Sequence, residues 1–281
     1  EIIPTTTQLK RKRNAINNEI EKYKARVCAR GDMILSILTS EDTYSPTISP
    51  LTFALILQIA VIFGMKKKTI DTVGAYLYQA YPTDKRLLFT TLDRNVAEVC
   101  GLDPEQIYMV LRYIYGLPDA GKAYYDAYST LLIKNDYIRS AMDPCLFYKI
   151  TPTDTTFIVI HVDDTFIFST SDTAINSFIN VLQSSFDITI NDDADSYLGV
   201  LFDEDLITGN VTLRQPKLIQ TIIEKYSPQV DTPPTSITIK DYQQLLGTLM
   251  YLTKSRPDIQ TSISFAATHA KDPKLEHYID L

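Results

Sequence analysis

The chain has no tryptophan, and only three cysteines occur among its 281 residues. Cys28, Cys100 and Cys145 lie far apart in the sequence, and no two of them form a CxxC pair. This spacing excludes a disulfide framework and a zinc knuckle, and it is typical of proteins from a reducing compartment.

The chain also lacks an excess of positive charge and a long apolar run. Its net charge is −7, so any surface that binds nucleic acid must be local. The longest apolar run, residues 51–63, is too short to span a bilayer, and no signal peptide is visible. We therefore expect neither membrane association nor secretion.

What the chain does contain is ordinary for a globular protein. Hydrophobic residues make up 45% and charged residues 22%, and the length allows a large core with two or three subdomains. The sequence starts with Glu and ends without a tail-like composition. We therefore expect it to be a piece of a longer polyprotein.

The most informative stretch is residues 157–168, in which two β-branched and aromatic runs flank Asp163 and Asp164. This pattern predicts a β-hairpin, buried on both faces, with the two carboxylates at its tip. Two charges on a buried scaffold are costly without a cation, and hard oxygen ligands suit Mg²⁺. The alternative is a solvated turn, where Asp is common.

A basic strand is expected over residues 22–30, after a strand at 8–13 and a turn at 14–18. Alternation places Lys22, Lys24, Arg26 and Arg30 on one face and apolar residues on the other, so the strand should be half-buried. Four cations in a row suit a triphosphate or a nucleic-acid backbone. A solvated sheet face is the alternative.

A strand over residues 65–71 ends in Asp71, and a glycine and small residues follow. This acid could lie near the hairpin tip, although an ordinary capping aspartate would look the same.

The remaining pattern predicts several further elements. Ser49-Pro50 begins a helix that is apolar nearly all round, which indicates a core helix ending at Gly64. The other expected elements are an irregular polar segment at 78–106, strands at 107–114, 145–150, 197–202 and 211–213, helices at 119–135, 215–226, 241–253 and 258–270, a helix capped by Ser171-Asp172, and a linker at 227–240.

Eight short segments, in this order and spacing, resemble the reverse transcriptase of copia-type long-terminal-repeat retrotransposons. They are residues 22–31, 44–46, 71–77, 115–117, 143–145, 162–164, 197–199 and 245–258.

The resemblance implies an α+β fold, the right-hand polymerase with fingers, palm and thumb, whose antiparallel palm sheet is backed by helices. Residues 1–70 would form the fingers, 71–190 the palm with a finger insertion at 78–118, 191–226 the primer-grip hairpin and the start of the thumb, and 227–281 a linker with thumb or connection helices.

The resemblance also implies RNA-directed DNA polymerisation by two-metal nucleotidyl transfer. Asp71, Asp163 and Asp164 match the family's catalytic metal ligands, with Mg²⁺ as cofactor and Mn²⁺ as a substitute. Asp71 and Asp163 are the expected direct ligands, with Asp164 in support.

Further roles come from the same resemblance. Lys24, Arg26, Tyr76 and Asp119 would lie at the incoming dNTP, with Tyr76 selecting against a 2′-hydroxyl. His161, Tyr197 and Gly199 would contact the primer and template.

Each of these assignments has an alternative or a departure from the family. Tyr76 can instead be a core aromatic, and Gly199 a strand bulge. His161 stands where the family usually has Tyr. Asp119 stands where it often has Gln, so this carboxylate should point away from the triphosphate or pair, for example with Lys122.

The expected partners are an RNA or DNA template with its primer, dNTPs, and other parts of a Pol polyprotein such as integrase and ribonuclease H, or a second copy. The expected location is cytoplasmic, in a virus-like particle, or nuclear. The alternative function is a decayed or domesticated polymerase-fold protein that acts as a nucleic-acid-binding or assembly scaffold. A nucleotidyl cyclase is disfavoured, because a finger strand and thumb helices would be superfluous to it.

Overall fold

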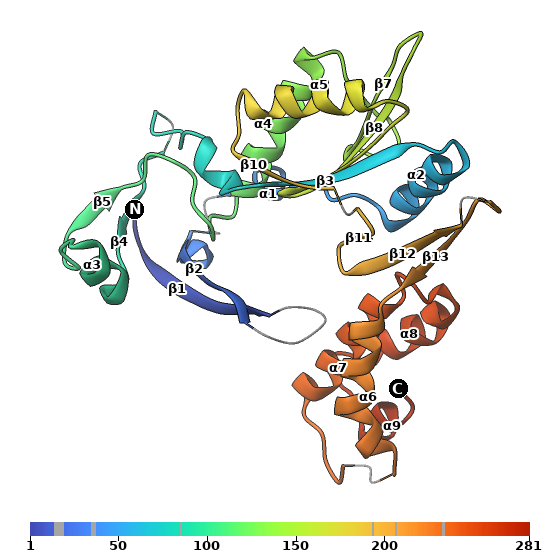
Figure 1. Ribbon diagram of the computed structural model, residues 1–281. Helices are drawn as coiled ribbons and strands as arrows, with labels where there is room; N and C mark the ends of the chain where they lie inside the picture. The colour runs from blue at the N-terminus through green and yellow to red at the C-terminus, as the bar shows by residue number, and fades with distance from the viewer. Residues whose placement is uncertain (14–19, 35–37, 85, 193, 206, 232–233) are drawn as a thin grey trace. The chain divides into compact units, whose positions relative to one another are not determined.

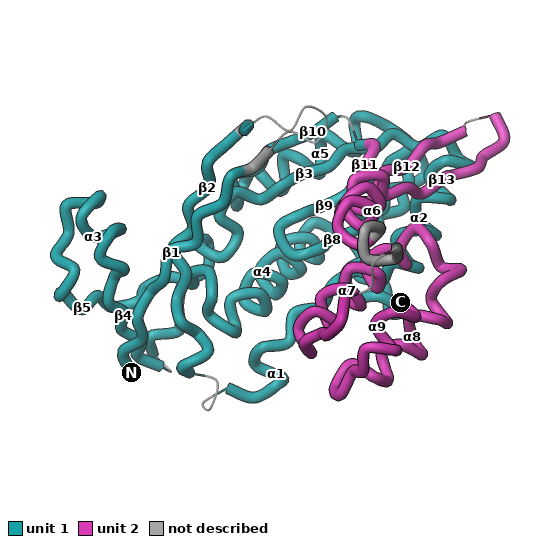
Figure 2. The backbone as a smooth tube through the Cα atoms, turned by 90° about the horizontal axis from the view of Figure 1, so that it is seen from below, with its two compact units in different colours: residues 1–194 teal, residues 195–281 magenta. Residues whose placement is uncertain are grey.

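The computed structural model describes all 281 residues except 14–19, 35–37, 85, 193, 206 and 232–233. The turn expected at 14–18 therefore lies outside the described residues. The chain divides into two compact units, Glu1–Ala194 and Asp195–Leu281 (Figure 2). The finer division into fingers, palm and thumb stays a prediction. Within the described residues, no helix has the length and apolar character needed to cross a membrane.

A six-stranded antiparallel sheet organises the first unit (Figure 1). Its order is β10-β3-β9-β8-β7-β6. The strands are β3 (Lys66–Thr72), β6 (Ile138–Arg139), β7 (Leu146–Ile150), β8 (Thr155–His161), β9 (Asp164–Ser169) and β10 (Ile188–Asn191). The antiparallel arrangement was expected, whereas β6 and β10 were not.

The β8–β9 hairpin is buried on both faces, as predicted. Phe166, Ile167 and Phe168 of β9 are all 0% exposed. On one face α2 (Pro50–Ile62) packs through Phe53, whose ring lies 5.8 Å from that of Phe166. On the other face lies α4 (Ala120–Lys134), which contacts β9 through a hydrogen bond between Tyr128 and Thr165. Helix α5 (Asp172–Gln183) also packs on β9, and Ser171 caps it as expected.

Helix α2 differs from the predicted core helix, because only one of its faces is buried. Phe53 and Leu57 face the core, but Leu51 is 79% and Leu55 58% exposed. The helix ends at Ile62, and Gly64 follows as the expected stop residue with a positive φ of 57°. Ser49 is the N-cap residue, but its side chain makes no capping hydrogen bond. Periodicity could not reveal the exposed face, since the residues on both faces are apolar.

A second sheet has the order β2-β1-β4-β5. Its strands are β1 (Ile2–Arg13), β2 (Ile20–Ala29), β4 (Phe89–Thr91) and β5 (Ile107–Met109), and α3 (Arg94–Cys100) follows β4. The expectation of an irregular 78–106 segment was therefore wrong, and the predicted strand at 107–114 is shorter. Short helices η1 (Gly31–Met33), α1 (Ser40–Thr43) and η3 (Ala75–Tyr78) complete this unit.

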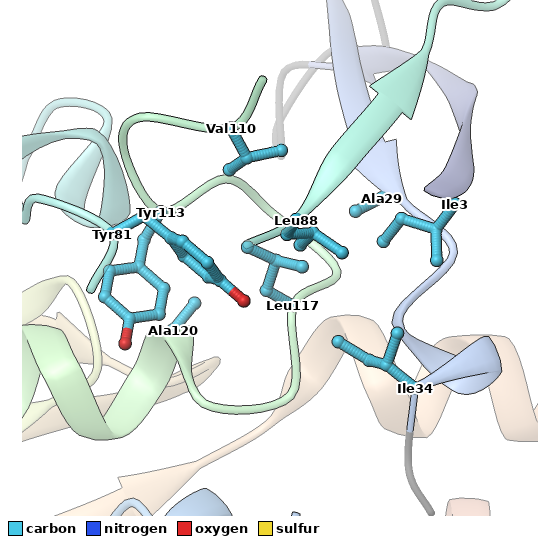
Figure 3. Packing of buried hydrophobic residues seen from close by; sticks show 9 residues of the cluster. All are labelled: Ile3, Ala29, Ile34, Tyr81, Leu88, Val110, Tyr113, Leu117 and Ala120. Atoms are coloured by element: carbon cyan, nitrogen blue, oxygen red, sulfur yellow. The ribbon is translucent and has the colours of Figure 1, made fainter. Parts of the chain in front are cut away.

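The core beneath this sheet joins segments that are distant in sequence. Figure 3 shows Ile3, Ala29 and Ile34 beside Leu88 and Leu117, with the rings of Tyr81 and Tyr113 close to Ala120 at the start of α4. Among the described side chains of β2, only Cys28 and Ala29, at the end of the strand that enters this core, are buried. Tyr23 is 71% exposed, so the expectation that one whole face of this strand is buried was wrong.

The second unit combines a three-stranded sheet with helices. Its elements are β11 (Ser196–Tyr197), β12 (Val200–Asp205), β13 (Asn210–Arg214), α6 (Pro216–Asp231), α7 (Ile239–Leu252), η4 (Pro257–Ile259), α8 (Gln260–Ala267) and α9 (Leu275–Ile279). Tyr242, Leu245, Leu246, Ile263 and Tyr278 form its helical core.

Three predictions for this unit need correction. The strand expected at 197–202 is two strands with a turn between them. Helix α6 continues to Asp231, so the linker expected from residue 227 begins inside it. Helix α9 was not predicted.

Candidate active site

The strand register brings Asp71 opposite Asp164. Strands β3 and β9 are antiparallel neighbours, and the two acids are paired residues in their register. Asp163 lies in the turn before β9, and its carbonyl oxygen accepts a hydrogen bond from the backbone N–H of Thr72 at 3.0 Å. Three carboxylates from two separate segments therefore share one end of the sheet.

The turn that places Asp163 has an unusual backbone. His161 pairs with Asp164 across the hairpin, which leaves Val162 and Asp163 as the connecting residues. Val162 has a φ of +57°, where hairpins normally place glycine. A β-branched residue is disfavoured in this conformation, so the buried strands must impose it.

Burial and like charge act together on Asp164. Desolvation is the largest cause, followed by the charges of Asp163 and Asp71, and together they raise the pKa of Asp164 to about 6. The Lys24 ammonium acts in the opposite direction and lowers this pKa. Lys24 therefore lies within electrostatic reach of the acids, although it comes from a distant strand.

The three acids provide the hard oxygen donors that Mg²⁺ prefers, and a bound cation would relieve the repulsion around Asp164. Their side chains are nevertheless not arranged as a ready-made ligand group. Across the described residues, no set of three or more His, Cys, Asp or Glu side chains is placed to hold a metal ion. The donor types fit the cation, and the convergence of the three side chains on it stays a prediction.

An aromatic and cationic cluster lies beside the acids. The Arg26 guanidinium stands 5.1 Å from the ring centroid of Tyr115, and that ring lies 4.8 Å from the ring of Tyr76. Burial and then the charge of Asp163 raise the pKa of Tyr76 and of Tyr115. Tyr76 and Tyr115 therefore lie within electrostatic reach of Asp163, and Arg26 lies against Tyr115.

Two glycines allow this cluster to form. The backbone N–H of Ala29 donates to the carbonyl oxygen of Tyr115 at 2.7 Å. A Cβ on Gly116 would lie 2.2 Å from the Ala29 carbonyl oxygen, and one on Gly31 would lie 2.0 Å from that of Gly116. Only glycine permits such close backbone contact, which holds Tyr115 beside the end of the basic strand.

Comparison with known proteins identifies the family. The family model described as "Reverse transcriptase (RNA-dependent DNA polymerase)" matches residues 1–239. The chain belongs to this reverse transcriptase family. The resemblance inferred from the sequence motifs is thereby confirmed.

Curated relatives are Pol polyproteins of plant transposons. The Retrovirus-related Pol polyprotein from transposon TNT 1-94 of Nicotiana tabacum is 22% identical over 284 residues, covering 92% of this chain and 21% of the polyprotein. Those from transposons RE1 and RE2 of Arabidopsis thaliana are each 21% identical, covering 93% of this chain and 18% and 19% of the polyproteins. The chain thus spans about a fifth of the length of these relatives.

Asp119, one of the family-derived dNTP positions, has a different partner from the one expected. It is only 8% exposed, and its Oδ2 accepts a hydrogen bond from an Arg86 guanidinium nitrogen at 2.8 Å. The Tyr113 hydroxyl donates to the same oxygen at 3.3 Å. Lys122 instead pairs with Asp126, one helical turn away. The charge of Asp119 is therefore neutralised by Arg86.

The residues predicted to contact the primer and template belong to both compact units: His161 to the first, and Tyr197 and Gly199 to the second. His161 ends β8 at the acid-bearing turn. Tyr197 is buried at the end of β11, and Gly199 follows in the turn to β12 with a φ of +73°. Gly199 is therefore a turn residue rather than a strand bulge. The contacts of all three with nucleic acid stay predictions.

Several residues of this site had no predicted role. Tyr115 belongs to the 115–117 segment, where Gly116 was the available signal, because glycine permits close backbone contact. Tyr124 and Tyr128 lie on one face of α4, and their hydroxyls bond the threonines that follow Asp71 and Asp164. No local signal marked these contacts, because Asp-Thr pairs also occur elsewhere in the chain, for example at residues 42–43 and 172–173.

Proposed function

We propose that this domain is an RNA-directed DNA polymerase that extends a primer with dNTPs by two-metal nucleotidyl transfer. The observation that supports this most directly is the register of β3 and β9, in which Asp71 faces Asp164 beside Asp163. Three carboxylates at one sheet end match the family's catalytic acids in number and type. Asp71 and Asp163 would be direct ligands, with Asp164 in support.

When bound by these acids, Mg²⁺ or Mn²⁺ would neutralise charge on the reacting phosphate and lower the pKa of the primer 3′-hydroxyl. The protein's own contribution is placement. The buried hairpin fixes the carboxylates on a rigid scaffold, and preorganised charge is the main catalytic resource in phosphoryl transfer. The raised pKa of Asp164 is consistent with a site that favours an added positive charge.

Lys24 and Arg26 are suited to the triphosphate of the incoming nucleotide. Lys24 lies on the exposed part of β2, and Arg26 is half-buried against Tyr115. In the described part of the chain, the buried Nε of Arg26 has no hydrogen-bond partner. A phosphate oxygen would satisfy this donor. Tyr76, beside Tyr115, would form the wall that rejects a 2′-hydroxyl.

Asp119 is better suited to a supporting role than to direct nucleotide contact. Its buried pairing with Arg86 removes the repulsion that a free carboxylate would exert on a triphosphate. His161 at the hairpin tip would contact the primer end, and the Tyr197–Gly199 turn its backbone. The resulting polymerase would have fingers, palm and thumb and act on a template–primer duplex as part of a larger Pol polyprotein.

A non-catalytic scaffold is the second candidate, because the three carboxylates do not form a ready-made ligand group among the described residues. A basic cross-strand pair on β1 and β2, Lys10 with Lys24, would still attract nucleic acid in such a protein.

Primer extension separates the two candidates. The 281-residue chain is assayed on poly(rA)/oligo(dT) with Mg²⁺, beside Asp163→Asn and the control Asp172→Asn. Asp172 is an exposed acid on α5 that pairs with Lys66. We expect Asp163→Asn to lower extension by roughly 100-fold or more, because a charge that faces the transition state is lost. Asp172→Asn should retain extension. Wild-type protein that binds the duplex without extending it would favour the scaffold.

A further inference from the structure

A threonine follows each of the two acids that face one another, and helix α4 binds both threonines. The Tyr124 hydroxyl donates to Thr72 Oγ1 at 2.9 Å. The Tyr128 hydroxyl and Thr165 Oγ1 are hydrogen-bonded at 2.7 Å. All four side chains are buried, with exposures of 2% or less. The acid-bearing ends of β3 and β9 are thus attached to one helix by matching contacts.

The arrangement relates the threonines to the acids through the strand backbone. Neighbouring residues of a strand point to opposite faces, so a threonine held on the α4 side directs the preceding carboxylate away from α4. Tyr124 and Tyr128 are one helical turn apart and share a face of α4. Asp71 pairs with Asp164 in the register. The two tyrosines therefore attach the acid-bearing ends of both strands to one face of α4.

The tyrosines are themselves held rigidly. The ring of Phe186 lies 5.7 Å from the rings of both Tyr124 and Tyr128, and it stacks on Tyr128 with an interplanar angle of 21°. The two tyrosine rings are 5.7 Å apart. Side chains that are locked by packing can hold the groups of a site within a fraction of an ångström of their required positions.

Stability alone does not require these hydroxyl pairs. Phenylalanine and valine have nearly the same shapes as tyrosine and threonine. Replacing both partners of a buried hydrogen bond by apolar groups of the same shape is close to neutral for stability, whereas replacing one leaves a buried polar group unsatisfied. What the hydrogen bonds add over apolar packing is directional placement of the strand ends.

We propose that Tyr124 and Tyr128, through Thr72 and Thr165, are positioning residues that orient the carboxylates of Asp71 and Asp164 for divalent cation binding. This inference rests on the proposed polymerase function. It deepens that proposal by assigning the support of the acids to four buried hydroxyl groups.

The experiment compares paired substitutions with a control from the same helix. The paired variants are Tyr124→Phe/Thr72→Val and Tyr128→Phe/Thr165→Val, each made beside its single substitutions. The control is Tyr125→Phe, because the buried Tyr125 hydroxyl of α4 donates to the Pro144 carbonyl oxygen at 2.7 Å instead of to an acid-bearing strand. Mn²⁺ binding to the 281-residue chain is measured by electron paramagnetic resonance, and stability by thermal unfolding.

We expect both paired variants to bind Mn²⁺ about 10-fold more weakly than wild type, the usual effect of losing the outer support of a metal ligand. Their thermal stability should return toward wild type relative to the single variants. In primer extension kcat should fall with little change in KM for dNTP. Tyr125→Phe should match wild type in Mn²⁺ affinity. Recovery of Mn²⁺ affinity together with stability in the paired variants would overturn the inference, because the hydroxyls would then serve only the fold.

Asp71→Asn separates failure of this inference from failure of the proposed function. Mn²⁺ binding that is weakened by Asp71→Asn but unchanged in the paired variants overturns only the positioning role. Mn²⁺ binding that is insensitive to Asp71→Asn overturns the metal site itself, and the positioning role with it.

Discussion

Two hairpins of this chain have two-residue connections with a non-glycine residue at positive φ, yet they are supported differently. In the β8–β9 hairpin only Val162 has a positive φ, and Asp163 follows it. In the β11–β12 hairpin both Leu198 and Gly199 do, as in a type I′ turn. The second turn therefore needs a glycine, while the first can place a carboxylate at the equivalent position.

The surroundings explain how each backbone is maintained. The β8–β9 hairpin lies inside a six-stranded sheet between α2 and α4, and burial on both faces imposes the conformation of Val162. The β11–β12 hairpin belongs to a three-stranded sheet, and the Tyr251 hydroxyl donates to the carbonyl oxygen of Leu198 at its tip. The β8–β9 hairpin is held rigidly by burial, and it is the hairpin that carries the two carboxylates. A preorganised site requires its charged groups to lie on such a rigid element.

The largest expected effect on stability comes from disrupting the β11–β12 turn with Gly199→Ala. A side chain is disfavoured at a φ of +73°, and the new Cβ would lie 2.8 Å from the Tyr251 hydroxyl oxygen. We expect a loss of about 2 kcal/mol in the free energy of unfolding, measured by urea denaturation. Gly247→Ala in α7 is the control, because its Cβ would meet no atom within 4 Å. It should stabilise the helix by roughly 0.5–1 kcal/mol. Equal stability of the two variants would show that the turn adapts.

The same two hairpins show what the sequence could predict. The β8–β9 hairpin was predictable because a polar pair interrupts two apolar runs. The β11–β12 turn was not, since Leu198-Gly199 interrupts an apolar run without a polar residue, and periodicity reads such a run as one strand. Helix α2 gave the opposite error, because apolar residues on both faces hid its exposed side.

The candidate site was predictable where it depended on local pattern and family motifs, and less so where it depended on distant contacts. Asp71 and Asp164 are paired in the register of β3 and β9, and the charge of Lys24 acts on Asp164. The pairing of Asp119 with Arg86 joins residues 33 positions apart, and no local spacing indicates it. Lys122, three residues from Asp119, was the nearer candidate, but it faces Asp126 on the same helix.

We expect the β8–β9 hairpin, which carries Asp163 and Asp164, to be less stable at neutral than at acidic pH. The pKa of Asp164, about 6, lies above its ordinary value of 3.8, so the folded state binds the proton more tightly. This contribution is complete below pH 3.8 and is lost as the pH rises through about 6. Without divalent cations, Asp164→Asn should therefore stabilise the protein at pH 7.5 by about 1–2 kcal/mol, after allowance for solvent screening.

Urea unfolding at pH 5 and pH 7.5 tests this expectation, and the gain from Asp164→Asn should shrink at pH 5. Asp203→Asn in β12 is the control from the other hairpin, because that exposed acid pairs with Arg214. An exposed ion pair contributes little, so no gain at pH 7.5 is expected there. A gain from Asp164→Asn of the same size at both pH values would contradict the role of charge.

The smallest effect should come from relieving the backbone of the first hairpin with Val162→Gly. Glycine adopts a φ of +57° without the steric penalty that valine incurs, so the folded state loses strain. The greater freedom of glycine in the unfolded chain offsets part of this gain. We expect a net stabilisation of roughly 0.5–1 kcal/mol, measured by urea denaturation. Val162→Ala is the control, because it shortens the side chain but keeps a Cβ at positive φ. If Val162→Gly destabilises the protein more than Val162→Ala does, packing of the partly buried Val162 side chain, rather than imposed strain, governs the tip.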